Sequence, residues 1–178
     1  MALIKLNNQS LSAVSALPAG VGGKVLNVVQ DTIGTTTSGV TSTGTNVFVD
    51  SGLQASIIPS SASSKIFITY EIFLSSSATN YQTKSRIMRD STPVGLGTSE
   101  GTRGVASAIA NTYNGYSSHG NYHIHSQGIS FLDEPATTSQ ITYKIQVAAY
   151  SGVTWYLNRS ASFQDGGTLG YDAIPLST

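Results

Sequence analysis

Residues 131–147 read FLDEPATTSQITYKIQV, a short β-rich run, a turn of one proline with small hydroxyl residues, and an alternating strand. One face of that strand is apolar and carries Ile141, Tyr143, Ile145 and Val147. A period of two predicts a strand with one buried and one wet face. Residues 56–70, SIIPSSASSKIFITY, repeat the same order of run, proline turn and strand. The pair predicts an antiparallel, all-β fold.

The composition limits the class of protein and its possible partners. The chain has 178 residues, no cysteine and a formal net charge of zero, and 10% of its residues are charged. The length suits one domain, and a disulfide framework, a thiol nucleophile and a cysteine zinc site are excluded. Few clustered cations argue against nucleic acid or an anionic membrane as partner. The first 24 residues lack the pattern of a signal peptide, so we expect synthesis in a cytoplasm. A surface with so few charges is poorly suited to a dilute monomer, so we expect the protein to be part of an assembly.

The rest of the chain reads as further strands. Residues 24–30 are apolar on most of both faces, which predicts a strand deep in a sandwich. Residues 66–74 form the longest predicted strand, with 84–89 as its antiparallel partner and 90–93 as a turn. A helical turn is predicted near 106–111, and later strands follow at 123–129, 140–150, 153–157 and 167–176. About eight to ten strands at this spacing predict a two-sheet β-sandwich or jelly roll. A β-solenoid would need a short repeat, which the sequence lacks.

The N-terminus differs from the rest, and we divide the chain into a docking arm with its linker (1–22) and one jelly-roll domain (23–178). Leu11, Val14 and Leu17 recur every three residues before a Gly/Pro linker. This spacing fits a short helix or an extended arm around a three-fold axis, and an unstructured terminus fits as well. The residues expected to dock the arm on a particle are Leu3, Ile4, Leu6, Leu11, Val14 and Leu17.

Several segments carry a family resemblance: MALIKL at 1–6, GKVLNVVQ at 23–30, IIPSSASSKI at 57–66, RDST at 89–92, LDEPATTS at 132–139, and 152–160 ending in LNRS. Their order resembles phage virion proteins with a jelly-roll domain like that of tumour necrosis factor and complement-type trimers. The resemblance implies a homotrimer in a tailed-phage virion, in contact with major capsid or tail proteins. It implies a head-decorating or fibre protein, or a tail protein that contacts the receptor.

Three histidines lie close together in sequence, His119, His123 and His125. On a strand, the last two point to one side, a spacing that can hold a metal, especially where three chains meet at an axis. No carboxylate lies nearby in sequence to support them. Polar histidines on a strand face or loop are the favoured interpretation, and no metal or other cofactor is expected.

Enzymatic chemistry is not expected. No Gly-x-Ser-x-Gly elbow or other nucleophile motif is present. Paired carboxylates for glycoside cleavage would have to come from scattered acids, and Asp133 and Glu134 lie on opposite sides of the chain in a turn.

Carbohydrate binding is the main functional alternative, because aromatic faces stack on sugar rings. Tyr113, Tyr116 and Tyr122 are the candidate glycan contacts, and the first two lie in an irregular loop, where binding residues concentrate. Trp155 shares a strand face with Val153 and Leu157, which predicts a place in the core or an interface.

We therefore expect a non-enzymatic, trimeric virion protein that decorates the capsid or forms a head fibre and docks through its N-terminal arm. The alternative is a tail fibre or receptor-binding protein that recognises glycans of the host surface.

Overall fold

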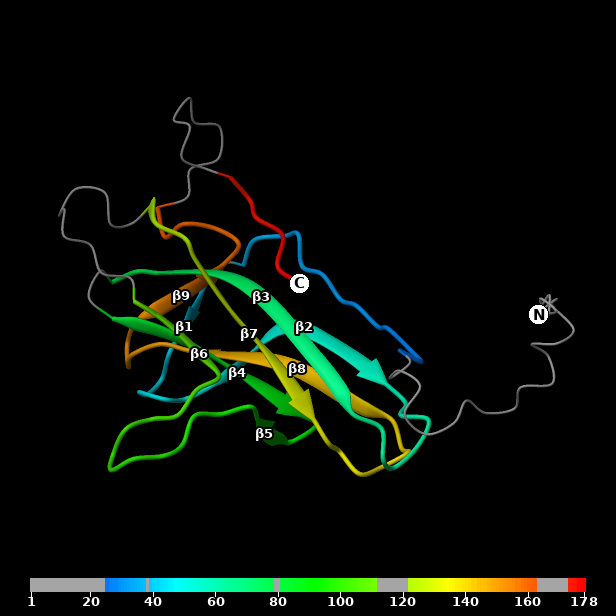
Figure 1. Cartoon of the computed structure of the whole chain (residues 1–178). Coiled ribbons are helices and arrows are strands. Elements are labelled where there is room, and N and C mark those ends of the chain that lie inside the picture. Colours follow the sequence, from blue (N-terminus) through cyan, green and yellow to red (C-terminus); the bar gives the residue numbers. More distant parts are fainter. Residues whose placement is uncertain (1–24, 38, 79–80, 112–121, 163–172) are drawn as a thin grey trace, which may run out of the picture.

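The computed structural model describes residues 25–37, 39–78, 81–111, 122–162 and 173–178. Within them the chain forms β-strands and no α-helix, which confirms the all-β prediction (Figure 1). The strands are β1 (Val40–Thr41), β2 (Val49–Ile57), β3 (Ile66–Ser76), β4 (Gln82–Arg89), β5 (Thr92–Val94), β6 (Ala108–Asn111), β7 (His125–Asp133), β8 (Ile141–Ala148) and β9 (Thr154–Leu157).

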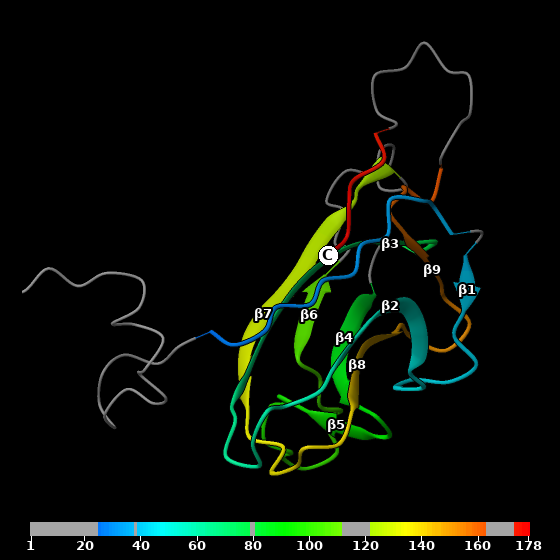
Figure 2. The same cartoon turned by 90° about the vertical axis from the view of Figure 1, so that its right-hand side faces the viewer.

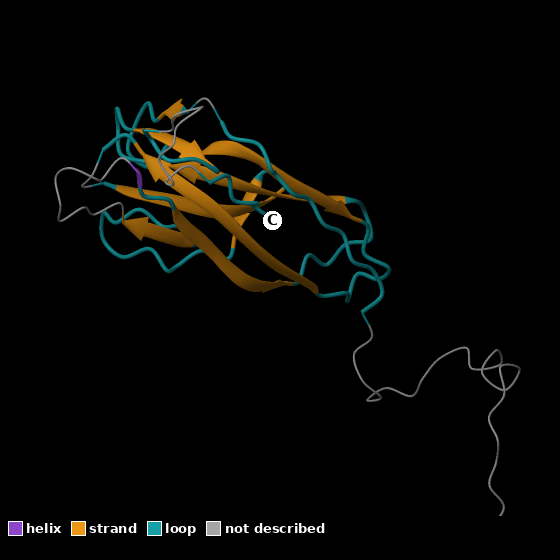
Figure 3. Cartoon of the chain, turned by 90° about the horizontal axis from the view of Figure 1, so that it is seen from above, coloured by secondary structure: helices purple, strands orange, loops and turns teal. Residues whose placement is uncertain are grey.

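The strands form two antiparallel sheets, as expected of a β-sandwich (Figures 1 and 2). One sheet has four strands in the order β1-β9-β3-β7. The other has five strands, in which β2-β8-β4-β5 form a path and β6 also pairs with β4. Seen from above, strands make up the body and loops gather at its ends (Figure 3).

The hydrophobic core draws on both sheets. The predicted inner face of β8 is buried along its whole length, with the alternate residues more exposed. Trp155 is 1% exposed on β9, which confirms the prediction that it belongs to the core or an interface and assigns it to the core. The core residues are Leu53, Tyr70, Ile72, Leu74, Ile87, Ile141, Tyr143, Ile145, Val147, Ala149, Val153, Trp155 and Leu157.

The proline-containing turns of the segments 56–70 and 131–147 lie side by side at one end of the molecule. They connect β2 to β3 and β7 to β8, and the β3–β7 ladder begins there with Ile66 opposite Asp133. Lys65 Nζ lies 2.7 Å from Glu134 Oε1, so an exposed ion pair joins the two turns.

The predicted pairing of 84–89 with 66–74 is wrong. These residues belong to β4, which pairs with β5, β6 and β8 in the opposite sheet, whereas β3 pairs with β7 and β9. Alternation indicates which side chains share a face, but it does not identify the neighbouring strand. The connection after β3 therefore crosses from one sheet to the other.

Two other local predictions are also wrong. Residues 25–30 form no strand and pair with none of the described strands, and Val25 and Val28 are exposed rather than buried. Apolar residues alone do not make a buried strand, since a strand also needs a partner for its backbone hydrogen bonds. The helical turn near 106–111 is instead the strand β6, which pairs with β4 from Gln82 opposite Asn111 to Ser85 opposite Ala108. The turn predicted at 90–93 is confirmed in part: Asp90 and Ser91 join β4 to β5, and Asp90 takes a positive φ of 52°, but Thr92 and Pro93 belong to β5.

The C-terminal end extends the four-stranded sheet. Of the strand predicted at 167–176, residues 167–172 lie outside the described part and 173–176 form no strand. Ser177 instead forms a bridge with Ile33, and Thr178 exchanges two backbone hydrogen bonds with Glu71 of β3. Asn158 secures this arrangement: its Nδ2 donates to the carbonyl of Ile33 at 2.6 Å, and its Oδ1 accepts from Ser177 Oγ at 2.6 Å.

Candidate functional site

Several predicted site residues lie outside the described residues. They are all six arm residues (Leu3, Ile4, Leu6, Leu11, Val14 and Leu17), the loop tyrosines Tyr113 and Tyr116, and His119. The docking arm and the loop glycan contact stay predictions.

Tyr122, His123 and His125 are described, at the start of β7. Tyr122 is half-buried, and the rings of His123 and His125 lie with their centroids 6.1 Å apart. Burial, together with the charge of His123, lowers the pKa of His125. No group of three or more His, Cys, Asp or Glu side chains gathers anywhere in the described residues. Two imidazoles alone do not complete the four ligands of a structural zinc site.

Asn158 starts an Asn-Arg-Ser sequence of the kind that accepts N-linked sugar. Its side chain is fully buried, and its amide nitrogen already donates to the carbonyls of Ile33 and Thr35. A glycan cannot occupy this position in the folded protein, so Asn158 is a structural residue.

The outer face of β3 and β7 carries an exposed apolar pair. Phe67 lies directly opposite Leu132, and these side chains are 67% and 49% exposed. Thr69 and Ser130 form the next outward pair, followed by Glu71 opposite Gly128. We call these six residues the β3–β7 outer face. It holds two large apolar side chains, three small residues and one charge.

β7 is also an edge strand of this sheet. Among the described residues it forms a ladder with β3 alone, and β6 of the other sheet lies close to it without pairing. A long edge strand with unpaired backbone groups is a template for another chain, and monomers usually protect it with charges, prolines or bulges. Between His125 and Leu132, β7 carries no Lys, Arg, Glu, Asp or Pro. The outer face and this edge together resemble half of an interface.

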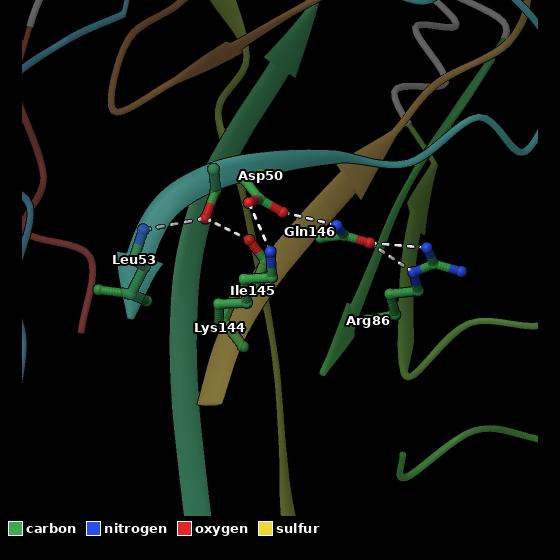
Figure 4. A network of polar contacts seen from close by, with 7 residues as sticks. Asp50, Leu53, Arg86, Lys144, Ile145 and Gln146 are labelled. Carbon is green, nitrogen blue, oxygen red and sulfur yellow. Dashed lines mark hydrogen bonds and ion pairs between the residues drawn. The ribbon is translucent and has the colours of Figure 1, made fainter. Parts of the chain in front are cut away.

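The outer face of the five-stranded sheet is different, because a polar network covers it (Figure 4). Asp50 accepts hydrogen bonds from Lys144 Nζ at 2.7 Å and from Gln146 Nε2 at 2.5 Å. Arg86 donates to Gln146 Oε1 through Nε and Nη2 and lies 4.2 Å from the ring centre of Phe48. The bond from Lys144 is the main reason that the pKa of Asp50 is lowered. Such a charged, internally bonded face is typical of a surface that stays in water.

The buried titratable groups Asp133 and Tyr143 form a structural hydrogen-bonded contact rather than a reactive site. Asp133 accepts from Tyr143 Oη at 2.6 Å and from Arg89 Nη1 at 3.0 Å. Burial, and then the hydrogen bond to Asp133, raises the pKa of Tyr143 well above its usual value. The phenol therefore stays protonated at neutral pH and cannot act as a general base.

Alternation along the strand at 66–74 places Phe67 on the face opposite Ile66 and Ile68, but no functional role was predicted for it. The signal was present, because a phenylalanine on the wet face of an alternating strand is exposed unless something covers it. The pairing with Leu132 could be found only once the β3–β7 register was known.

The sequence matches no protein-family model and no curated protein. In the described part of the chain, no helix has the length and apolar character needed to cross a membrane.

Proposed function

We propose that the chain is a non-enzymatic structural protein of a tailed-phage virion, built as a homotrimer of jelly-roll domains. In this proposal residues 23–178 form the domain, and the arm at 1–22 docks on a capsid or tail protein. Within that class we favour a head-decorating or head-fibre role over a tail adhesin.

The exposed β3–β7 outer face is the observation that carries the proposal. Complete burial of a phenylalanine or leucine side chain contributes about 1.5–3 kcal/mol, a gain that Phe67 and Leu132 largely forgo in a single chain. A copy of the same chain supplies a surface equally poor in charge. Self-association would cover these side chains at little cost in desolvated charge.

Closed symmetry would use the β7 edge in every copy. This edge forms no ladder with a second described strand, and a head-to-tail contact between copies would pair every such edge only if it closes into a ring. Three-fold closure is what the resemblance to tumour necrosis factor-like and complement-like trimers implies. The virion setting rests on the same resemblance, and its segments at 57–66 and 132–139 include the adjacent proline turns.

Native mass spectrometry tests the assembly. We expect the full-length wild-type chain to be a trimer, and the double variant Phe67→Glu with Leu132→Glu to be a monomer that still unfolds cooperatively. The matched control is Ile109→Glu, since Ile109 is similarly exposed but lies on β6 of the other sheet. A monomeric wild type, or a double variant that remains trimeric, would contradict the proposal.

The role in the virion is tested separately. Deletion of residues 1–22 should prevent incorporation of the protein into particles while the domain stays folded. Undiminished incorporation would rule out docking by the arm, and cryo-electron microscopy of particles would locate the protein on head or tail.

A further inference from the structure

Two tyrosines meet at one end of the five-stranded sheet. Tyr81 precedes β4 and Tyr150 follows β8, and their rings stack with centroids 4.5 Å apart and planes 16° from parallel. Both side chains reach solvent, at 39% and 47% exposure. Aromatic rings at a surface usually bury their faces against the protein body, so an exposed stack offers a flat apolar platform to a ligand.

Polar side chains surround this platform. Together with the two rings they line a cavity of about 200 Å³, to which Thr45, Gln82, Lys84 and Asn111 contribute. Gln82 and Lys84 alternate along β4 and therefore share one face, and Asn111 of β6 lies directly opposite Gln82. The cavity is smaller than the roughly 300–1,000 Å³ of sites for drug-sized ligands, which suits one sugar ring.

The charge at this cavity is positive. Lys84 Nζ donates to the amide oxygen of Asn46 at 2.5 Å, and it pairs with no carboxylate among the described residues. Arg86 lies two residues further along the same face of β4, and Asp50, the acid that interacts with it, is already bonded to Lys144 and Gln146. An anion would therefore gain a charge-assisted bond at Lys84 without displacing an existing ion pair.

We propose that this cavity binds a carboxylated sugar residue of a surface polysaccharide, such as a uronic acid. The pyranose ring lies against the tyrosine stack, the carboxylate pairs with Lys84, and the amides of Gln82 and Asn111 bind ring hydroxyls. All these residues come from one chain, so the site does not depend on the assembly proposed above. Asn111 is also two residues before Tyr113, one of the glycan contacts expected from the sequence.

Two matched probes test the site, methyl β-glucuronide and methyl β-glucoside, which differ only at C6, a carboxylate in the first and a hydroxymethyl group in the second. Titrations of the full-length protein followed by NMR measure both affinities. We expect the glucuronide to bind about two- to fivefold more tightly, the preference that one exposed ion pair supplies. Lys84→Gln should abolish this preference while glucoside binding persists, and Tyr150→Ala should remove binding of both sugars.

The control variant is Lys65→Gln, which removes an exposed lysine at the other end of the domain and should leave both affinities unchanged. Melting temperatures of all variants establish that the fold is intact. Absence of glucuronide binding at millimolar concentration would overturn the proposal, as would a preference that survives Lys84→Gln or is lost equally in Lys65→Gln.

Discussion

The phenol of Tyr143 donates a 2.6 Å hydrogen bond to Oδ2 of Asp133, and this bond joins the two sheets, since Tyr143 lies on β8 and Asp133 ends β7. Arg89 of β4 reaches the same carboxylate with Nη1 at 3.0 Å. Asp133 is nearly fully buried, so its charge is held by these two partners rather than by water. The three residues therefore determine how the sheets meet beside the proline turns.

Removal of the Tyr143 hydroxyl tests this contact between the two sheets. Tyr143→Phe should lower the free energy of unfolding by about 1.5–3 kcal/mol, because it deletes a hydrogen bond to a buried charge. The control is Tyr70→Phe, which deletes the bond between Tyr70 Oη and Ser85 Oγ, a neutral pair. That change should cost about 0.5–1.5 kcal/mol. Urea unfolding at pH 7 measures both, and an equal or reversed order would contradict the role assigned to Asp133.

Stability should also fall at high pH. Burial raises the pKa of Tyr143, and that of Tyr70, above the ordinary value of 10.0. The unfolded chain therefore loses these protons first, and stability that is complete below pH 10 declines as the pH rises further. Each tyrosine contributes a slope of up to about 1.4 kcal/mol per pH unit. Unfolding of the wild type and Tyr143→Phe between pH 9 and 11 should show a shallower decline in the variant, and parallel curves would refute the assignment.

Gly128 is expected to tolerate no side chain. A Cβ at this position would collide with the backbone carbonyl oxygen of Tyr70 on the neighbouring strand, which cannot rotate away. Gly128→Ala should cost about 1–3 kcal/mol or more, the range for overpacking. Gly101→Ala is the control: its φ of +61° is unfavourable for alanine, but nothing lies within 4 Å. Thermal unfolding should rank Gly128→Ala well below Gly101→Ala, and equal losses would contradict the clash.

Asn158→Asp should loosen the N- and C-terminal segments together. The substitution replaces the amide donor with an oxygen that faces the carbonyls of Ile33 and Thr35. Hydrogen exchange should speed up in residues 31–37 and 173–178 and change little in β8. Exchange that speeds up equally in β8 would show global destabilisation instead, and unchanged exchange would show that Asn158 does not hold these segments.

Much of the fold could be predicted from local patterns. Alternation along 66–74 and 141–147 identified the core faces correctly, because side chains of a strand point to opposite sides whatever the strand pairs with. A turn after 84–89 was identified because its residue types favour the backbone of a tight turn, although Thr92 and Pro93 belong to β5. That Trp155 belongs to the core or an interface followed from the neighbours on its strand face.

The pairing of the strands could not be predicted, because it depends on contacts between residues distant in sequence. The same alternation in 84–89 fits either sheet, and only the packed structure places it beside β8. Apolar character in 25–30 indicated a buried strand, but a strand in a sheet requires a pairing partner, and those residues pair with no described strand. The candidate sites depend on pairing as well: Phe67 meets Leu132, and Tyr81 meets Tyr150, only after folding.

The sequence by itself therefore determined the all-β class and the inward faces of the strands at 66–74 and 141–147, since the period of a strand is a local property. Only the tertiary structure decided which strands share a sheet, which apolar side chains stay exposed, and how Asp133, Arg89 and Tyr143 come together. These outcomes depend on the competition among many possible long-range pairings, which is settled by the burial of the whole core.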